Sequence, residues 1–160
     1  NNDILTYNTQ SLSIQRKIFS TLKLATKELV TMRKKEGMQI EKEFFKYLNI
    51  AHRDLKKIKT IQDKVFTKKV NSKSNIDAFD ELGKIEISEE IDRINSHLEQ
   101  ISQSIKSPQL SGKKINFILQ EINRESNTIM SKFLDKRISK SAISLKIQAE
   151  KLREQIGNIL

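Results

Sequence analysis

Apolar side chains recur at alternating steps of four and three residues through the second half of the chain. This spacing places them on one face of a helix and is typical of helices that pack side by side. Together with only four Gly and one Pro in 160 residues, it predicts an all-α protein of long antiparallel helices, arranged as a helical hairpin or coiled-coil-like bundle. The two regular series are Ile87, Ile91, Ile94, Leu98, Ile101 and Ile105, and Ile138, Ala142, Leu145, Ala149, Leu152, Ile156 and Ile159.

Breaks in this pattern divide the chain into four parts. Residues 1–10 carry no period and predict an N-terminal loop or arm, and residues 11–70 predict a long helical arm. Within that arm, Gly37 indicates either a kink, a close approach of another backbone, or a tolerated mid-helix glycine. Residues 71–83 predict a linker. Residues 84–160 predict a three-helix region with a break at Pro108, which cannot continue a helix.

The formal net charge of +10 favours polyanionic partners, with nucleic acid before an anionic membrane. Basic residues are densest between Arg53 and Lys73, where eight Lys or Arg stand against Asp54 and Asp63. Because Phe66 is the only aromatic residue among them, the stretch predicts either phosphate contacts without base stacking or a solvated helix face.

The chain has no Cys, no signal peptide and no apolar run long enough to span a bilayer. The lack of Cys excludes disulfides and thiolate metal sites and fits a reducing compartment. We therefore expect a cytoplasmic protein that does not bind membranes.

The helix predicted between Lys113 and Arg137 carries charge within its own apolar seam. The three-and-four spacing places positions 125 and 132 on the inward face, where the sequence has Glu125 and Lys132. Burying a charge is costly unless it is paired or bound to a ligand. The seam therefore indicates an inter-helix polar site. Its apolar members are Ile115, Ile118, Ile122 and Ile129.

Carboxylates are the chemistry that these helices could carry, since the sequence has no phosphate-binding loop, zinc-protease motif or nucleophile elbow. If the polar faces of two antiparallel helices meet, their acidic residues and one His could bind Mg²⁺ or Mn²⁺ and activate water against a phosphodiester. The alternative is an interhelical salt-bridge network that involves Arg124 and Lys132. The candidate metal ligands are Glu90, His97, Glu121 and Glu125.

Four stretches resemble a known family. ISEEIDRINSHLEQ (87–100), GKKINFILQEINRESNTIMSK (112–132) and LREQIGNIL (152–160), together with MRKKEG (32–37), are similar to the C-terminal region of the YicC/YloC family of bacterial proteins. The resemblance implies a metal-dependent endoribonuclease that assembles as a ring-like oligomer, with a hexamer expected. It also implies an N-terminal domain before this region, so we expect this chain, which starts at Asn1, to be a fragment or a processed product.

The family motifs match residues of the two predicted helices before and after Pro108. With Mn²⁺ or Mg²⁺ as the expected cofactor and RNA as the expected partner, we predict catalytic roles for Glu121, Glu125, Arg124, His97 and Lys132. The predicted RNA-binding residues are Arg93, Lys113, Lys114, Asn127, Thr128, Ser131, Lys136 and Arg137. The competing hypothesis is a non-catalytic helical module for oligomerisation or RNA binding, in which the polar seam sets helix register.

Overall fold

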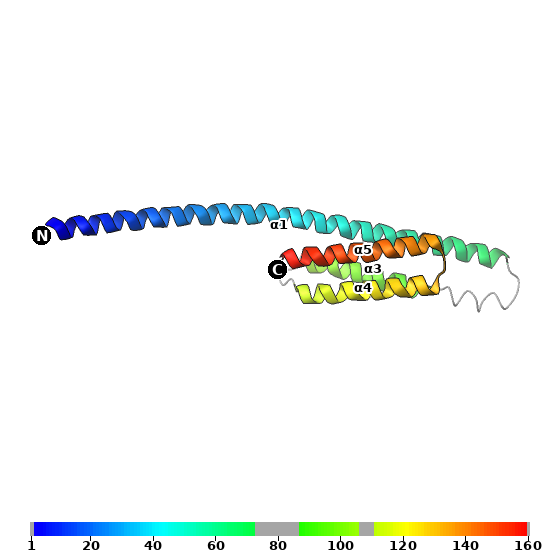
Figure 1. Ribbon diagram of the computed structural model, residues 1–160. Coiled ribbons are helices and arrows are strands. Elements are labelled where there is room, and N and C mark those ends of the chain that lie inside the picture. The colour runs from blue at the N-terminus through cyan, green and yellow to red at the C-terminus, as the bar shows by residue number, and fades with distance from the viewer. Residues whose placement is uncertain (1, 73–86, 106–110, 160) are drawn as a thin grey trace. The chain divides into compact units, whose positions relative to one another are not determined.

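A computed structural model describes residues 2–72, 87–105 and 111–159, with side chains described for 12–67, 87–105 and 111–157. Within these ranges the backbone forms four helices and no strand. They are α1 (Asn2–Ser72), α3 (Ser88–Ile105), α4 (Gly112–Lys132) and α5 (Lys136–Ile159) (Figure 1). The predicted all-α class is therefore confirmed.

Helix α1 is longer than the sequence pattern predicts. It begins at Asn2, so residues 2–10, predicted as a loop or arm, are helical, and it continues to Ser72. The remainder of the predicted linker, residues 73–83, lies outside the described residues. At Gly37 the helix is uninterrupted, and an added Cβ would meet nothing within 4 Å. Of the three interpretations of this glycine, the structure supports a tolerated mid-helix residue.

Contacts between residues divide the chain into two units, residues 1–39 and 40–160. In the first unit, every described side chain from Leu12 to Gln39 is exposed. The apolar side chains there, Leu22 and Leu29 among them, thus have no packing partner among the described residues. This stretch of α1 contributes nothing to the core.

The second unit has one hydrophobic core to which all four helices contribute. The seams predicted for α3, α4 and α5 are buried in it, as is the stripe of α1 from Phe44 to Ile58. Burial of these apolar faces is what stabilises such helices against one another. The fully buried large side chains are Phe44, Ile58, Ile87, Ile94, Leu98, Ile101, Ile115, Leu119, Ile122, Ile129, Ile138 and Leu145.

Side-chain contacts confirm that consecutive helices run antiparallel. The end of α4 reaches the start of α3, where the Lys132 ammonium bonds Glu90. Between α4 and α5, Asn123 Nδ2 donates to Glu150 Oε1 at 3.2 Å. The turn before α5 is closed by Asp135, whose carboxylate accepts from the Arg137 backbone N–H at 2.8 Å. A carboxylate here also complements the positive end of the helix.

Candidate functional site

Two carboxylates are buried where α3 faces α4. Glu90 on α3 is 3% exposed, and Glu125 on α4 is 6% exposed. The heptad spacing predicted the inward position of Glu125 and is confirmed at that position. At Lys132 the structure differs, because α4 ends there and the residue is exposed. The second buried charge is thus the Glu90 carboxylate and not the Lys132 ammonium.

Each buried carboxylate bonds a cation of the opposite helix. Lys132 Nζ lies 2.7 Å from Glu90 Oε1, and Arg93 Nη1 lies 3.2 Å from Glu125 Oε1. Arg93 also bonds Glu89 through Nη2. We call Glu89, Glu90, Arg93, Glu125 and Lys132 the α3–α4 ion-pair network. It is an interhelical salt-bridge network, as in the alternative interpretation, but its pairs differ, because Glu125 bonds Arg93 and not Arg124, and Lys132 bonds Glu90.

The cations of the network remain accessible to solvent although their partners do not. The side chain of Arg93 is 51% exposed, and that of Lys132 is 41% exposed. The hydrogen bond that Arg93 donates to Glu125, with the negative charge of Glu89, raises the pKa of Arg93, and the hydrogen bond that Lys132 donates to Glu90 raises the pKa of Lys132. Both groups therefore stay protonated at neutral pH, and they present fixed positive charge at the surface.

The remaining predicted catalytic residues lie beside this network. Glu121 is partly buried, and its Oε2 lies 4.0 Å from Arg124 Nη1 on the same helix. His97 is partly buried on α3, and its Nδ1 has no hydrogen-bond partner. Glu90 Oε2 is likewise buried without a partner. Both orphan atoms belong to predicted metal ligands.

These ligands nevertheless do not form a metal site within the described part of one chain, where no three Asp, Glu or His side chains are grouped so as to hold an ion. Glu90 and His97 are seven residues apart, which is about 10 Å along a helix. Glu90 and Glu125 are also each bound by a cation. The predicted four-ligand cluster is therefore not assembled here, and Mn²⁺ or Mg²⁺ stays a prediction from the resemblance.

The predicted RNA-binding residues fall into separate groups. Lys113 and Lys114 are exposed in the first turn of α4, at the opposite end of that helix from Lys132. Five other members already have partners within the chain: Arg93, Asn127, Thr128, Ser131 and Arg137. The Asn127 Oδ1 accepts from Lys146 Nζ at 2.8 Å, and the Thr128 and Ser131 hydroxyls donate to backbone carbonyls one turn earlier in α4. Lys136 and Arg137 are exposed in the first turn of α5.

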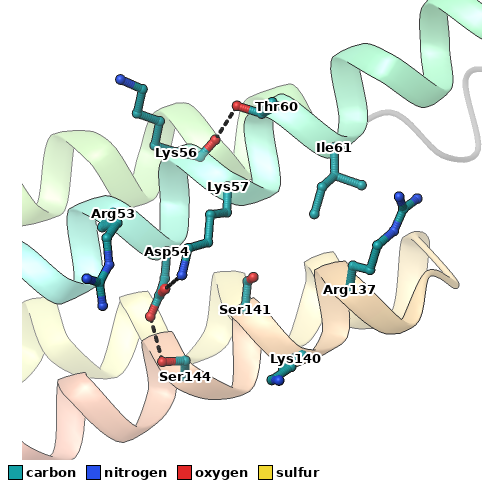
Figure 2. Close-up of a pocket in the computed structure, with 10 residues that line it drawn as sticks. All are labelled: Arg53, Asp54, Lys56, Lys57, Thr60, Ile61, Arg137, Lys140, Ser141 and Ser144. Carbon is teal, nitrogen blue, oxygen red and sulfur yellow. Dashed lines mark hydrogen bonds and ion pairs between the residues drawn. The ribbon is translucent and has the colours of Figure 1, made fainter.

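A second polar site, which the sequence did not reveal, is a pocket between α1 and α5 (Figure 2). Its volume is about 620 Å³. Five of its lining residues are basic and one is acidic, so it carries a net positive charge. It is lined by Arg53, Asp54, Lys56, Lys57, Thr60, Ile61, Arg137, Lys140, Ser141 and Ser144. We call it the α1–α5 pocket.

Asp54, the acidic residue of this pocket, is buried and fully engaged. Its Oδ1 accepts from Lys57 Nζ at 2.8 Å, and its Oδ2 accepts from the Ser144 hydroxyl at 2.5 Å, which joins α1 to α5. The sequence indicated the basic stretch from Arg53 onward and singled out Arg137. Only the packing of α1 on α5 shows that the two basic segments share one pocket, because they are far apart in the chain.

Comparison with known proteins agrees with the motifs. A family model described as "Endoribonuclease YicC-like, C-terminal" matches residues 41–160. A protein of Haemophilus influenzae named probable endoribonuclease YicC is 41% identical over 76 residues, which are 48% of this chain and 26% of that protein. A Clostridioides difficile protein of the same name is 46% identical over 76 residues, again 48% of this chain and 26% of the relative.

The aligned stretch thus spans about a quarter of the length of these curated relatives. The family model, by contrast, extends over residues 41–160, which is more than half of this chain and includes α3, α4 and α5 entire. The chain therefore belongs to the YicC-like endoribonuclease family, and it corresponds to the family's C-terminal region.

Proposed function

We propose that this chain forms part of an endoribonuclease that cleaves phosphodiester bonds of RNA at the α3–α4 face. The observation that carries the proposal is the ion-pair network, in which buried Glu90 and Glu125 hold half-exposed Lys132 and Arg93 in place. Lys132 and Arg93 have further N–H donors beyond those that bond the carboxylates. They could therefore bind a phosphate without releasing their partners.

Such an arrangement suits a reaction in which negative charge grows on a phosphoryl group. When an oxygen nucleophile attacks phosphorus and the leaving oxygen departs, fixed cations stabilise the charge that develops. The buried carboxylates limit the motion of those cations. His97, with an unpartnered ring nitrogen, is the candidate to exchange a proton with the attacking or the leaving oxygen.

The dependence on Mn²⁺ or Mg²⁺ and the assembly into a hexamer are part of the proposal because of the family resemblance. If an ion binds, Glu90, Glu121, Glu125 and His97 are the residues that would hold it, and it would polarise the phosphate and activate water. A rearrangement or ligands from outside the described residues would be needed, since these four do not group around one point.

Cleavage of an end-labelled RNA tests the proposal. The reaction is run with Mn²⁺, with Mg²⁺ and with EDTA, using the unmodified chain and the variants Glu121→Gln and Glu125→Gln, all checked for folding by circular dichroism. Glu154→Gln, an exposed carboxylate on α5, is the matched control. We expect both site variants to lose cleavage and the control to keep it. Undiminished cutting by both site variants would remove these residues from the mechanism.

A second candidate is a non-catalytic module that binds RNA or holds helices in register. The structure of the network favours it in one respect: each of the two buried carboxylates has a cation partner, as in a purely structural salt bridge. This alternative predicts salt-dependent RNA binding with no turnover under any of the metal conditions above.

A further inference from the structure

We infer that the α1–α5 pocket binds the phosphate backbone of the RNA, at a face of the bundle other than the α3–α4 network. The inference rests on the proposed function for the identity of the ligand and adds a binding site to it. It requires no base recognition, because the lining has five basic residues, three hydroxyl residues and no aromatic ring.

The cations of this pocket are available for a ligand. Among the described residues, Arg53, Lys56 and Lys140 form no ion pair with a carboxylate, in contrast to the cations of the α3–α4 network. Arg53 on α1 and Lys140 on α5 both line the pocket. In Figure 2, Lys56 extends away from α5. The pocket thus has a cation from each of its two helices, and Lys56 adds charge from its outer edge.

The acidic residue of the pocket does not oppose an anion. Both oxygens of Asp54 accept hydrogen bonds, from Lys57 and from Ser144, so the carboxylate is neutralised inside the wall. Arg137 is shared with Asp135, to which it donates through Nε and Nη2. The first turn of α5, which holds Arg137, adds the positive end of a 24-residue helix.

The ligand that fits these features is a phosphodiester and not an acidic protein segment. An Arg and a Lys from two different helices suit an anion with several acceptor oxygens, and arginine binds phosphate through two donors at once. The volume of the pocket, about 620 Å³, also leaves room for more than one phosphate group. Contacts of this kind position a strand without reading its sequence.

The test is RNA binding as a function of salt in the presence of EDTA, with a single-stranded oligonucleotide carrying 2′-O-methyl groups, so that neither attack by the 2′-oxygen nor metal-dependent hydrolysis cleaves it. The pocket variant is Arg53→Gln/Lys140→Gln. The matched control is Lys46→Gln/Lys59→Gln, which removes the same charge from exposed positions of α1 outside the pocket. The affinity of the 160-residue chain for the oligonucleotide is measured by fluorescence anisotropy. The salt concentration is varied between about 50 and 200 mM, the range over which counterion release is seen.

We expect the pocket variant to bind about five- to thirty-fold more weakly than the unmodified chain, and the control to change much less. The slope of log affinity against log salt should fall by about 1.4, because each phosphate contact to a single strand contributes about 0.7. Oligouridine and oligoadenosine should respond alike. An equal loss in both variants, or none in either, would overturn the inference, as would tighter binding of an acidic peptide than of the oligonucleotide. Because this assay measures binding alone, a loss of binding confined to the pocket variant supports the inference even if the labelled-RNA assay shows that the chain does not cleave RNA.

Discussion

Replacing Glu125 by Leu separates a functional role of the buried charge from a structural one. Glu125 lies between Ile122 and Ile129 in the seam of α4 and is buried against α3. The substitution removes a carboxylate whose burial is costly and places an apolar side chain at an apolar position. The attraction that is lost is weak, because the partner Arg93 is half exposed and keeps its bond to Glu89.

We expect the free energy of unfolding to rise by about 1–2 kcal/mol, because replacing a buried ion pair by apolar packing is commonly neutral or stabilising. This corresponds to a rise in Tm of a few degrees, at about 2–4 °C per kcal/mol. RNA cleavage should be lost in the same protein. Urea denaturation followed by circular dichroism gives the stability, and the labelled-RNA assay gives the activity.

Two outcomes would contradict this reasoning. A loss of more than about 1 kcal/mol in stability would mean that the pair with Arg93 holds α3 against α4, as in the structural hypothesis. Retained cleavage in a folded Glu125→Leu protein would mean that the Glu125 carboxylate has no role in catalysis. Glu125→Gln, which keeps the size of the side chain and removes its charge, distinguishes lost charge from altered packing.

Three further predictions concern residues outside that pair. Lys132→Met should lower the free energy of unfolding by about 1–2 kcal/mol in urea denaturation, less than for a fully buried pair, because Glu90 loses its cation but Lys132 is partly exposed. Arg137 lowers the pKa of Asp135 from 3.8 to about 2. The stabilisation from this ion pair should therefore be complete above about pH 4 and lost toward about pH 2. Arg137→Gln should flatten that part of the pH–stability curve, and an unchanged curve would refute the prediction. Gly37→Ala should stabilise α1 by about 1 kcal/mol, seen as higher helicity on heating, since the added methyl meets no neighbour.

Much of the fold could be predicted from the sequence because heptad spacing determines which face of each helix is apolar. Ile94, Ile122 and Leu145 were expected on inward faces and are buried, since only one face of each helix is apolar enough to leave water. The start of α1 could not be predicted in this way. Residues 2–10 have no apolar period, and their helical conformation continues from the residues that follow.

The candidate site was predictable in part. The spacing placed Glu125 inward, and the motifs directed attention to Glu90, which is also buried. The predicted inward position of Lys132 was wrong for a local reason. The periodic count continues through residue 132, whereas α4 ends there and the residue is exposed. The metal cluster stays a prediction: its four residues are not grouped in the described part of one chain, since residues that share a helix face can still be two turns apart.

What the sequence by itself determined is the helical class, the inward faces, and the family to which the motifs belong. These depend on local spacing and on residue identity, both of which can be read along the chain. Tertiary structure alone decided which polar groups meet across helices: Arg93 with Glu125, Glu90 with Lys132, and Asp54 with Ser144. Pairing across helices depends on the relative register of the helices and on how far each side chain reaches, over a few ångströms. Neither quantity can be read from the positions of charged residues that lie far apart in the chain.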